Sequence, residues 1–80
     1  MFELKIKACY FDAIINGKKL FELRKDDRNY KVGDLIHFNV IEDSYCSVFQ
    51  IFEITYILKD VPDYGLLPGF VILGIKPLLK

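Results

Sequence analysis

Residues 2–17 read FELKIKACYFDAIING, and the spacing of their apolar side chains changes part-way along. Over residues 2–7 apolar and charged residues alternate, which predicts a half-buried strand because successive strand side chains point to opposite faces. Over residues 10–16 the apolar side chains recur every three or four positions, as on one face of a short helix. Asn16 and Gly17 then predict a left-handed C-terminal stop. The chain is therefore expected to begin with a strand followed by a helix.

Four further strands are expected after this helix. They are rich in Val, Ile, Phe, Thr and Tyr, and loops with Gly, Pro or Asp separate them. The alternation slips around Gln50, which predicts a bulge or a bend there. The expected strands span residues 20–25, 35–41, 45–58 and 70–75. We predict an α+β fold, mainly β: a small curled barrel of about five strands, with one short helix after the first strand.

The composition indicates one globular domain, residues 1–80, with a neutral surface charge overall. The 80 residues include 11 Lys and Arg against 11 Asp and Glu, so the formal net charge is zero. This excludes a generally basic nucleic-acid coat but allows a local basic patch. Apolar residues make up 52 % and aromatic residues 15 % of the chain, well above the content of a disordered chain. Bulky aromatic side chains are expected to fill a small core.

No cofactor, metal or membrane partner is expected from the sequence. Cys9 and Cys46 lie far apart, and neither has a Cys or His at ligand spacing. We expect two reduced, mostly buried thiols in a cytoplasmic protein. No apolar run approaches the roughly 18 residues of a membrane span.

Positive charge is concentrated in residues 17–31. This segment holds six basic and three acidic residues, so it carries +3 and the remainder of the chain −3. Such a segment attracts phosphate. The six basic residues are Lys18, Lys19, Arg24, Lys25, Arg28 and Lys31.

Glu22 and Arg24 are two residues apart on a predicted strand, so their side chains leave the same face. Arg24 suits bidentate contacts to a phosphate or a base edge, and Glu22 can accept from an exocyclic amine such as that of cytosine. Lys18 and Lys19 lie just upstream, at the exit of the helix. The alternative is structural, an ion pair of Glu22 with Arg24 or Lys19 on a solvated strand. Both interpretations stay open on the residues alone.

Three more residues are candidates at the rim of such a site. Lys25 and Arg28 belong either to the rim or to a solvated loop. Tyr64 lies between Pro62 and Pro68 in a predicted loop, where it can stack on a base as a lid or pack back on the barrel. The predicted ligand-binding set is Lys18, Lys19, Glu22, Arg24, Lys25, Arg28 and Tyr64.

The segment from Gly17 to Asp34 resembles the signature of ASCH domains, a branch of the PUA-like superfamily. In that pattern a helix ends in Gly, a Lys and a Glu-x-Arg follow, and a Gly-Asp turn comes next. The closer resemblance is to a family of short, mostly bacterial and phage proteins of unknown function within that group. It covers nearly the whole chain, including residues 11–34, 55–58 and 69–73. The matching motif positions are Gly17, Lys19, Glu22, Arg24, Gly33 and Asp34.

The resemblance implies a PUA-like barrel with a cleft between the first helix and the barrel. The group is commonly proposed to bind RNA or modified nucleosides. One small bacterial branch hydrolyses acylated cytidine with a Lys that matches Lys19, a Thr three residues later and a distant Glu. This sequence has Glu22 in place of that Thr.

Three functions are therefore predicted as alternatives. The first is a module that binds RNA or a nucleotide through the basic motif. The second is a small amidohydrolase acting on acylated cytidine or another modified nucleoside, with Lys19 and Glu22 as the catalytic pair. A catalytic lysine must lose its proton, which Lys18 and Arg24 would favour and Glu22 would oppose. The third is a phage or accessory interaction protein without catalysis.

Overall fold

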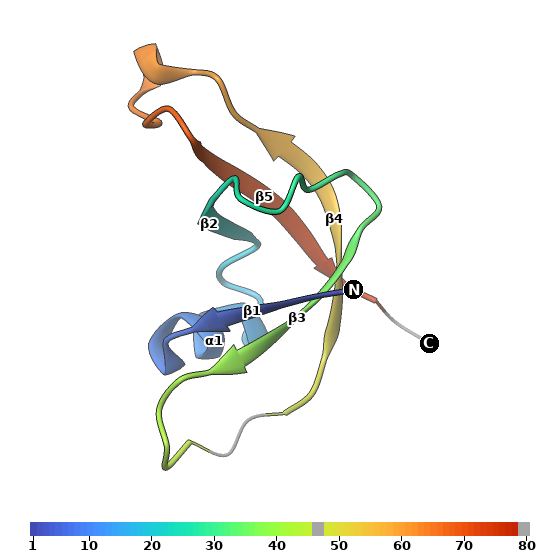
Figure 1. Cartoon of the computed structure of the whole chain (residues 1–80). Helices are drawn as coiled ribbons and strands as arrows, with labels where there is room; N and C mark the ends of the chain where they lie inside the picture. Colours follow the sequence, from blue (N-terminus) through green and yellow to red (C-terminus); the bar gives the residue numbers. More distant parts are fainter. Residues whose placement is uncertain (46–47, 79–80) are drawn as a thin grey trace.

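The computed structural model describes residues 1–45 and 48–78, which form five strands, one α-helix and a short 3₁₀ turn. The predicted α+β class, with one short helix after the first strand, is confirmed (Figure 1). The elements are β1 (Phe2–Ile6), α1 (Ala8–Ile15), β2 (Phe21–Lys25), β3 (Leu35–Val40), β4 (Ile51–Leu58), η1 (Pro62–Tyr64) and β5 (Phe70–Pro77).

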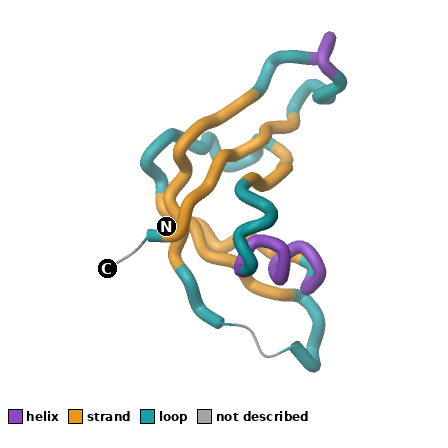
Figure 2. The backbone as a smooth tube through the Cα atoms, turned by 180° about the vertical axis from the view of Figure 1, so that it is seen from behind, coloured by secondary structure: helices purple, strands orange, loops and turns teal. Residues whose placement is uncertain are grey.

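The five strands form one sheet in the order β1-β3-β4-β5-β2, so β1 and β2 are its two edges. β1 pairs with β3 in parallel, and every other neighbouring pair is antiparallel. The sheet curls into a half-barrel that brings its two edges toward each other on the side where α1 lies (Figures 1 and 2). The predicted curl is confirmed, but no strand ladder joins β1 to β2 in the described ranges. We call the opening between these two edges the seam.

The core lies on the concave face of the sheet, where α1 covers one end. Phe11 and Ile14 of α1 are buried, and the Phe11 ring contacts Phe38 edge-on at 6.1 Å between ring centroids. Phe38 in turn contacts Phe52 of β4 at 5.5 Å. This confirms the expected role of aromatic side chains in the core. The other buried apolar residues are Leu4, Ile6, Tyr30, Ile36, Ile54, Val71, Leu73 and Ile75.

The helix begins two residues before the predicted start, at Ala8. Its first N–H has no local cap, and the Ala8 N–H instead donates to Glu42 Oε2 at 2.9 Å. This carboxylate comes from the segment after β3, so no local sequence signal shows it. Cys9, in the first turn, is exposed, so the expectation of a buried thiol is wrong there. Cys46 lies outside the described residues.

The C-terminal end of α1 fixes the start of the next segment. Gly17 adopts a positive φ of 75°, which confirms the predicted stop, since glycine takes this conformation without a Cβ clash. The N–H groups of Lys18 and Lys19 then both donate to the Ala13 carbonyl, at 2.9 and 3.0 Å. The backbone of Lys19 is therefore tied to the last turn of α1.

The strand predicted over 45–58 is shorter in the structure. β4 begins at Ile51, because β3 pairs with β4 only through Leu35–His37; residues 46–47 lie outside the described residues. Of the bulge or bend predicted around Gln50, a bulge there is wrong, since the register shift falls between Ile54 and Tyr56. Gly74 of β5 lies opposite this shift, and a Cβ there would come within 3.0 Å of Thr55 Oγ1. Because Gly74 has no side chain, there is room for Thr55, the extra residue of the bulge.

Candidate functional site

Strand β2 turns Glu22 and Arg24 toward the inside of the half-barrel and Phe21 and Leu23 outward. The Glu22 residue is only 6 % exposed, whereas Phe21 and Leu23 on the opposite face are 47 % and 53 % exposed. Burying a charge is costly unless the charge is paired and hydrogen-bonded. This reversal of the usual pattern marks β2 as the strand that carries the candidate site.

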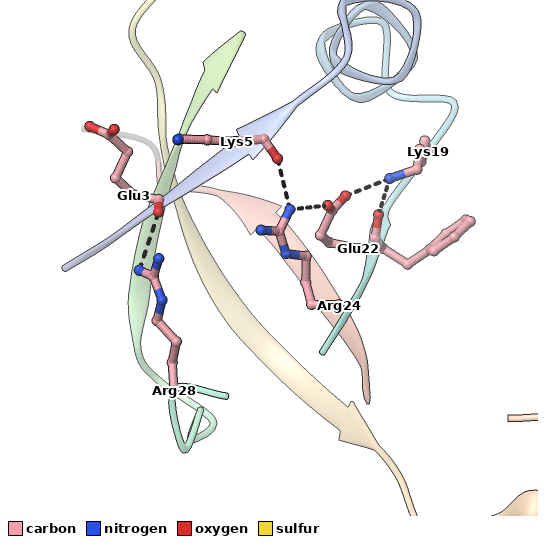
Figure 3. Close-up of polar contacts among 7 residues, drawn as sticks. Glu3, Lys5, Lys19, Glu22, Arg24 and Arg28 are labelled. Carbon is pink, nitrogen blue, oxygen red and sulfur yellow. Dashed lines mark hydrogen bonds and ion pairs between the residues drawn. The ribbon is translucent and has the colours of Figure 1, made fainter. Parts of the chain in front are cut away.

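Glu22 is held between two cationic side chains (Figure 3). Lys19 Nζ donates to Glu22 Oε1 at 2.8 Å, and Arg24 Nη1 donates to Glu22 Oε2 at 3.2 Å. Each carboxylate oxygen therefore has its own cationic donor. We call Lys19, Glu22 and Arg24 the polar network.

Lys19 is further surrounded by groups that attract positive charge. Its Nζ donates to the Phe21 carbonyl at 2.8 Å. It also lies 4.8 Å from the centroid of the Phe21 ring and 5.7 Å from that of Tyr10. Carboxylate, carbonyl and ring faces all stabilise an ammonium ion. Lys19 is therefore placed as a charged hydrogen-bond donor.

Two arginines bridge the seam from the β2 side. Arg24 Nη1 donates to the Lys5 carbonyl of β1 at 2.7 Å, and Arg28 Nη1 donates to the Glu3 carbonyl at 3.3 Å (Figure 3). Both carbonyls belong to an edge strand and lack a ladder partner on this side. Side chains thus close the half-barrel where backbone pairing stops.

A cleft of about 540 Å³ lies along the seam beside the polar network. This volume is within the range of small-molecule sites. The cleft is bounded by β1, the first turn of α1, the end of the α1–β2 loop, β2 and the residue after β3. Its charged lining residues are Lys5, Lys7, Lys19, Glu22 and Arg24. Its exposed apolar lining residues are Tyr10, Phe21, Leu23 and Ile41.

Tyr30 lies in the core near Arg24, with its hydroxyl out of water. The residue is 5 % exposed. The hydroxyl interacts with the Arg24 guanidinium, but among the described residues it makes no hydrogen bond of ordinary length and angle. Burial raises the pKa of Tyr30 above its ordinary value of 10.0, and the Asp27 charge adds to this. The nearby Arg24 and Arg28 guanidiniums lower this pKa in part. The neutral phenol is therefore the favoured form.

The structure brings together only part of the predicted ligand-binding set. Lys19, Glu22 and Arg24 line the cleft, whereas Lys18 and Lys25 are exposed elsewhere. Arg28 lies along the seam, with its guanidinium 6.0 Å from the Phe2 ring centroid, but it does not line the cleft.

Tyr64 is not part of the cleft either. It is 89 % exposed, and η1, which contains it, lies at the opposite end of the molecule from α1 (Figures 1 and 2).

Several cleft residues were not found from the sequence. Lys5 and Lys7 look like the solvent face of an alternating strand, and Tyr10 like an ordinary helix residue. These residues share the cleft because β1 and β2 are the two edges of the sheet and its curl brings those edges toward each other (Figure 1). The strand order depends on long-range pairing, which the local pattern does not show.

Among residues 1–45 and 48–78, no group of His, Cys, Asp or Glu side chains could hold a metal ion. Within the same ranges, no helix is long and apolar enough to cross a bilayer.

Comparison with known proteins places the chain in a family. The model of the DUF3850 family, a domain of unknown function, matches residues 1–75. The chain belongs to the DUF3850 family. This confirms the prediction that the chain belongs to a family of short proteins of unknown function.

A curated relative of this DUF3850 chain comes from Escherichia phage P2. It is an uncharacterized 12.9 kDa protein encoded in the GpA 3′ region, and it is 38 % identical over 61 residues. The match covers 76 % of the DUF3850 chain, which spans only 53 % of the phage protein's length. Among solved structures, the crystal structure of hypothetical protein PH0355 is similar, with a TM-score of 0.65. At 21 % identity over 96 % of this chain and 98 % of that one, the similarity shows a shared fold.

Proposed function

We propose that this DUF3850 chain binds RNA or a nucleotide in the cleft along the seam. The observation that carries the proposal is the buried Glu22 carboxylate, paired with Lys19 and Arg24 inside a cleft that also exposes apolar rings. A nucleotide combines a flat ring, polar ring edges and an anionic phosphate. The cleft offers a counterpart for each of these three features.

The energetics of the polar network support a role in binding. Taking charges out of water costs several kcal/mol per ion, and well-packed apolar residues often stabilise a fold as well as a buried ion pair does. A network of three ionic side chains on β2 and its preceding loop is thus a weak means of stabilising the sheet. Its position beside a cleft favours a ligand as the reason for it.

Each part of a nucleotide has a matching group. Four cationic side chains against one carboxylate give the cleft a charge of about +3, which attracts phosphate. The exposed Tyr10 and Phe21 rings suit stacking, which is sequence-tolerant because every base has a π-face. The resemblance to ASCH domains supports the same proposal, since it implies a ligand between the first helix and the barrel. Tyr10 of α1 and Lys19 lie at that place.

The test uses a fluorescently labelled, single-stranded RNA hexanucleotide of mixed sequence and measures its anisotropy. Lys19→Met is compared with Lys18→Met, because both remove one charge but only Lys19 lines the cleft. We expect Lys19→Met to weaken binding at least about 5-fold and Lys18→Met by less than 2-fold. Binding should also fall steeply between 50 and 200 mM salt, by a factor of about 10 or more. Absence of binding at low salt, or equal effects of the two variants, would overturn the proposal.

Hydrolysis of an acylated cytidine is a second candidate, in which the charged Lys19, whose Nζ lies 2.8 Å from Glu22 Oε1, would donate a hydrogen bond to the substrate carbonyl. Those two residues are the predicted catalytic pair, and the cleft holds both. The test is release of free cytidine from N4-acetylcytidine, followed by chromatography. Release by the wild type and none by Lys19→Met supports hydrolysis; equal release by both removes it. If neither RNA nor nucleoside binds and one stoichiometric protein partner co-purifies, the third alternative, an interaction protein, stands.

A further inference from the structure

The polar network has a fixed order of hydrogen-bonding roles. A lysine ammonium and an arginine guanidinium can only donate, and an ionised carboxylate can only accept. Lys19 and Arg24 approach Glu22 through different carboxylate oxygens, so the three groups lie in a row (Figure 3). The network therefore presents donor, acceptor, donor.

Each member of the row keeps capacity for another hydrogen bond. Lys19 Nζ uses two of its three protons, on the Phe21 carbonyl and Glu22 Oε1. Arg24 has five N–H groups and donates to Lys5 and Glu22 through Nη1 alone, so further donors remain on its guanidinium. Each Glu22 oxygen accepts one hydrogen bond from a cation and has a second lone-pair direction. All three side chains line the cleft, so a ligand there can use this capacity.

We propose that the cleft recognises an imide edge, the carbonyl–N–H–carbonyl group presented by uracil. This deepens, and rests on, the proposed binding of RNA or a nucleotide. An imide edge reads acceptor, donor, acceptor, which is the complement of the row. One carbonyl accepts from Lys19, the ring N–H donates to Glu22, and the second carbonyl accepts from Arg24.

Cytosine fits the row less well than uracil. Its edge presents donor, acceptor, acceptor, because an amino group replaces one carbonyl and the ring nitrogen beside it carries no proton. If the amino group of cytosine donates to Glu22, its ring nitrogen and carbonyl both lie on the Arg24 side. Lys19 then makes no hydrogen bond to the base. If the edge instead aligns with all three groups, the ring nitrogen's lone pair faces the carboxylate. A site whose polar groups are left unmatched rejects the wrong ligand strongly.

The aromatic side chains agree with this orientation. The Phe21 and Tyr10 rings both lie against the Lys19 ammonium, so a base held by Lys19 would lie next to them. Their faces can cover the flat ring while its edge meets the network. Lys5 and Lys7, on the β1 side of the cleft, are placed to attract the phosphate.

The experiment compares three ligands of equal charge: hexauridylate, hexacytidylate and a hexamer of 3-methyluridylate. The 3-methyl group removes only the imide proton and leaves both carbonyls. We expect hexauridylate to bind more tightly than either of the others by roughly 5- to 150-fold, the discrimination of one good base-edge contact. The readout is the dissociation constant from titration calorimetry.

A variant locates the preference on Glu22. In Glu22→Gln the acceptor-only carboxylate becomes an amide that can also donate, so the affinity for hexauridylate should fall to near that for the methylated hexamer. Circular dichroism reports whether this variant is folded. If it is not folded, Lys19→Met serves in its place, because it removes one donor of the row and leaves Glu22 paired with Arg24.

The outcomes separate this inference from the proposed function. Preference for hexauridylate over both other ligands supports the imide edge. Equal binding of the three, or tighter binding of hexacytidylate, overturns it while RNA binding stands. If none of the three binds, the proposed function fails, and this inference fails with it.

Discussion

The Arg24 guanidinium lies 2.7 Å from the backbone carbonyl of Lys5, across the seam between β2 and β1. The same Nη1 atom lies 3.2 Å from Glu22 Oε2. One side chain therefore both closes the half-barrel and completes the polar network. Changes at Arg24 should affect the fold and the cleft together.

Arg24→Gln is expected to lower the free energy of unfolding by about 1–3 kcal/mol, because it leaves the buried Glu22 with one cation and the Lys5 carbonyl without its donor. Urea unfolding followed by circular dichroism measures this change. Lys25→Gln, at the exposed neighbouring position, is the control and should stay within about 0.5 kcal/mol of wild type. Equal stability of the two variants would show that the seam contact contributes nothing.

Replacing the whole polar network should destabilise the fold less than Arg24→Gln does. The triple variant Lys19→Met, Glu22→Leu, Arg24→Met removes the buried Glu22 carboxylate together with its two cationic partners, so no buried charge is left unpaired. We expect its free energy of unfolding to lie within about 1 kcal/mol of wild type or above it. Its RNA affinity should fall at least about 10-fold, since both donors and the acceptor are gone. A triple variant less stable than Arg24→Gln would contradict this account of the network.

Tyr30→Phe is expected to leave stability at pH 7 within about 1 kcal/mol of wild type, because it removes both the desolvation of the buried hydroxyl and its interaction with the Arg24 guanidinium. The pH dependence follows from the raised pKa of Tyr30. The unfolded tyrosine loses its proton near pH 10, whereas the folded one keeps it to higher pH. The free energy of unfolding is therefore unaffected by this group below pH 10 and falls as the pH rises through the folded pKa.

The measurement for Tyr30 is the urea midpoint at pH 7 and at pH 11. Wild type should lose more stability between these values than Tyr30→Phe does. Tyr56→Phe is the matched control, because Tyr56 is 64 % exposed and therefore loses little hydration on folding. The same alkaline loss in wild type and Tyr30→Phe would argue against a buried phenol.

Two exposed aromatic residues test which end of the molecule meets RNA. Phe21→Ala should weaken RNA binding roughly 5- to 150-fold, the cost of losing one stacked base. Tyr64→Ala should change it by less than 2-fold, since η1 lies at the far end from α1 (Figure 1). Anisotropy titration with the mixed-sequence hexanucleotide measures both. A larger effect at Tyr64 than at Phe21 would move the binding surface away from the cleft.

The local patterns were sufficient to predict most elements of the fold. Alternation in residues 2–7 and the change of period after them predicted β1 and α1, and Gly17 predicted where the helix stops. These features depend on neighbouring residues only. The errors lie where distant residues decide, as when Glu42 caps α1 or Gly74 admits the bulge in β4.

The candidate site was predicted in part for a related reason. Lys19, Glu22 and Arg24 were found as a cluster, because a strand places Glu22 and Arg24 on one face. Which face of β2 is buried could not be read from hydrophobicity, since Phe21 and Leu23 favour the opposite answer. The contribution of β1 was missed because it requires the curl of the sheet.

The contacts that bridge the seam have a consequence for how this family can vary. Arg24 and Arg28 bind to main-chain carbonyls of Lys5 and Glu3, and every amino acid provides the same carbonyl. Substitutions at positions 3 and 5 can therefore accumulate without breaking the bridge, whereas the arginines are constrained by their own side chains. Covariation between the two strands would be weak here, although they are in direct contact.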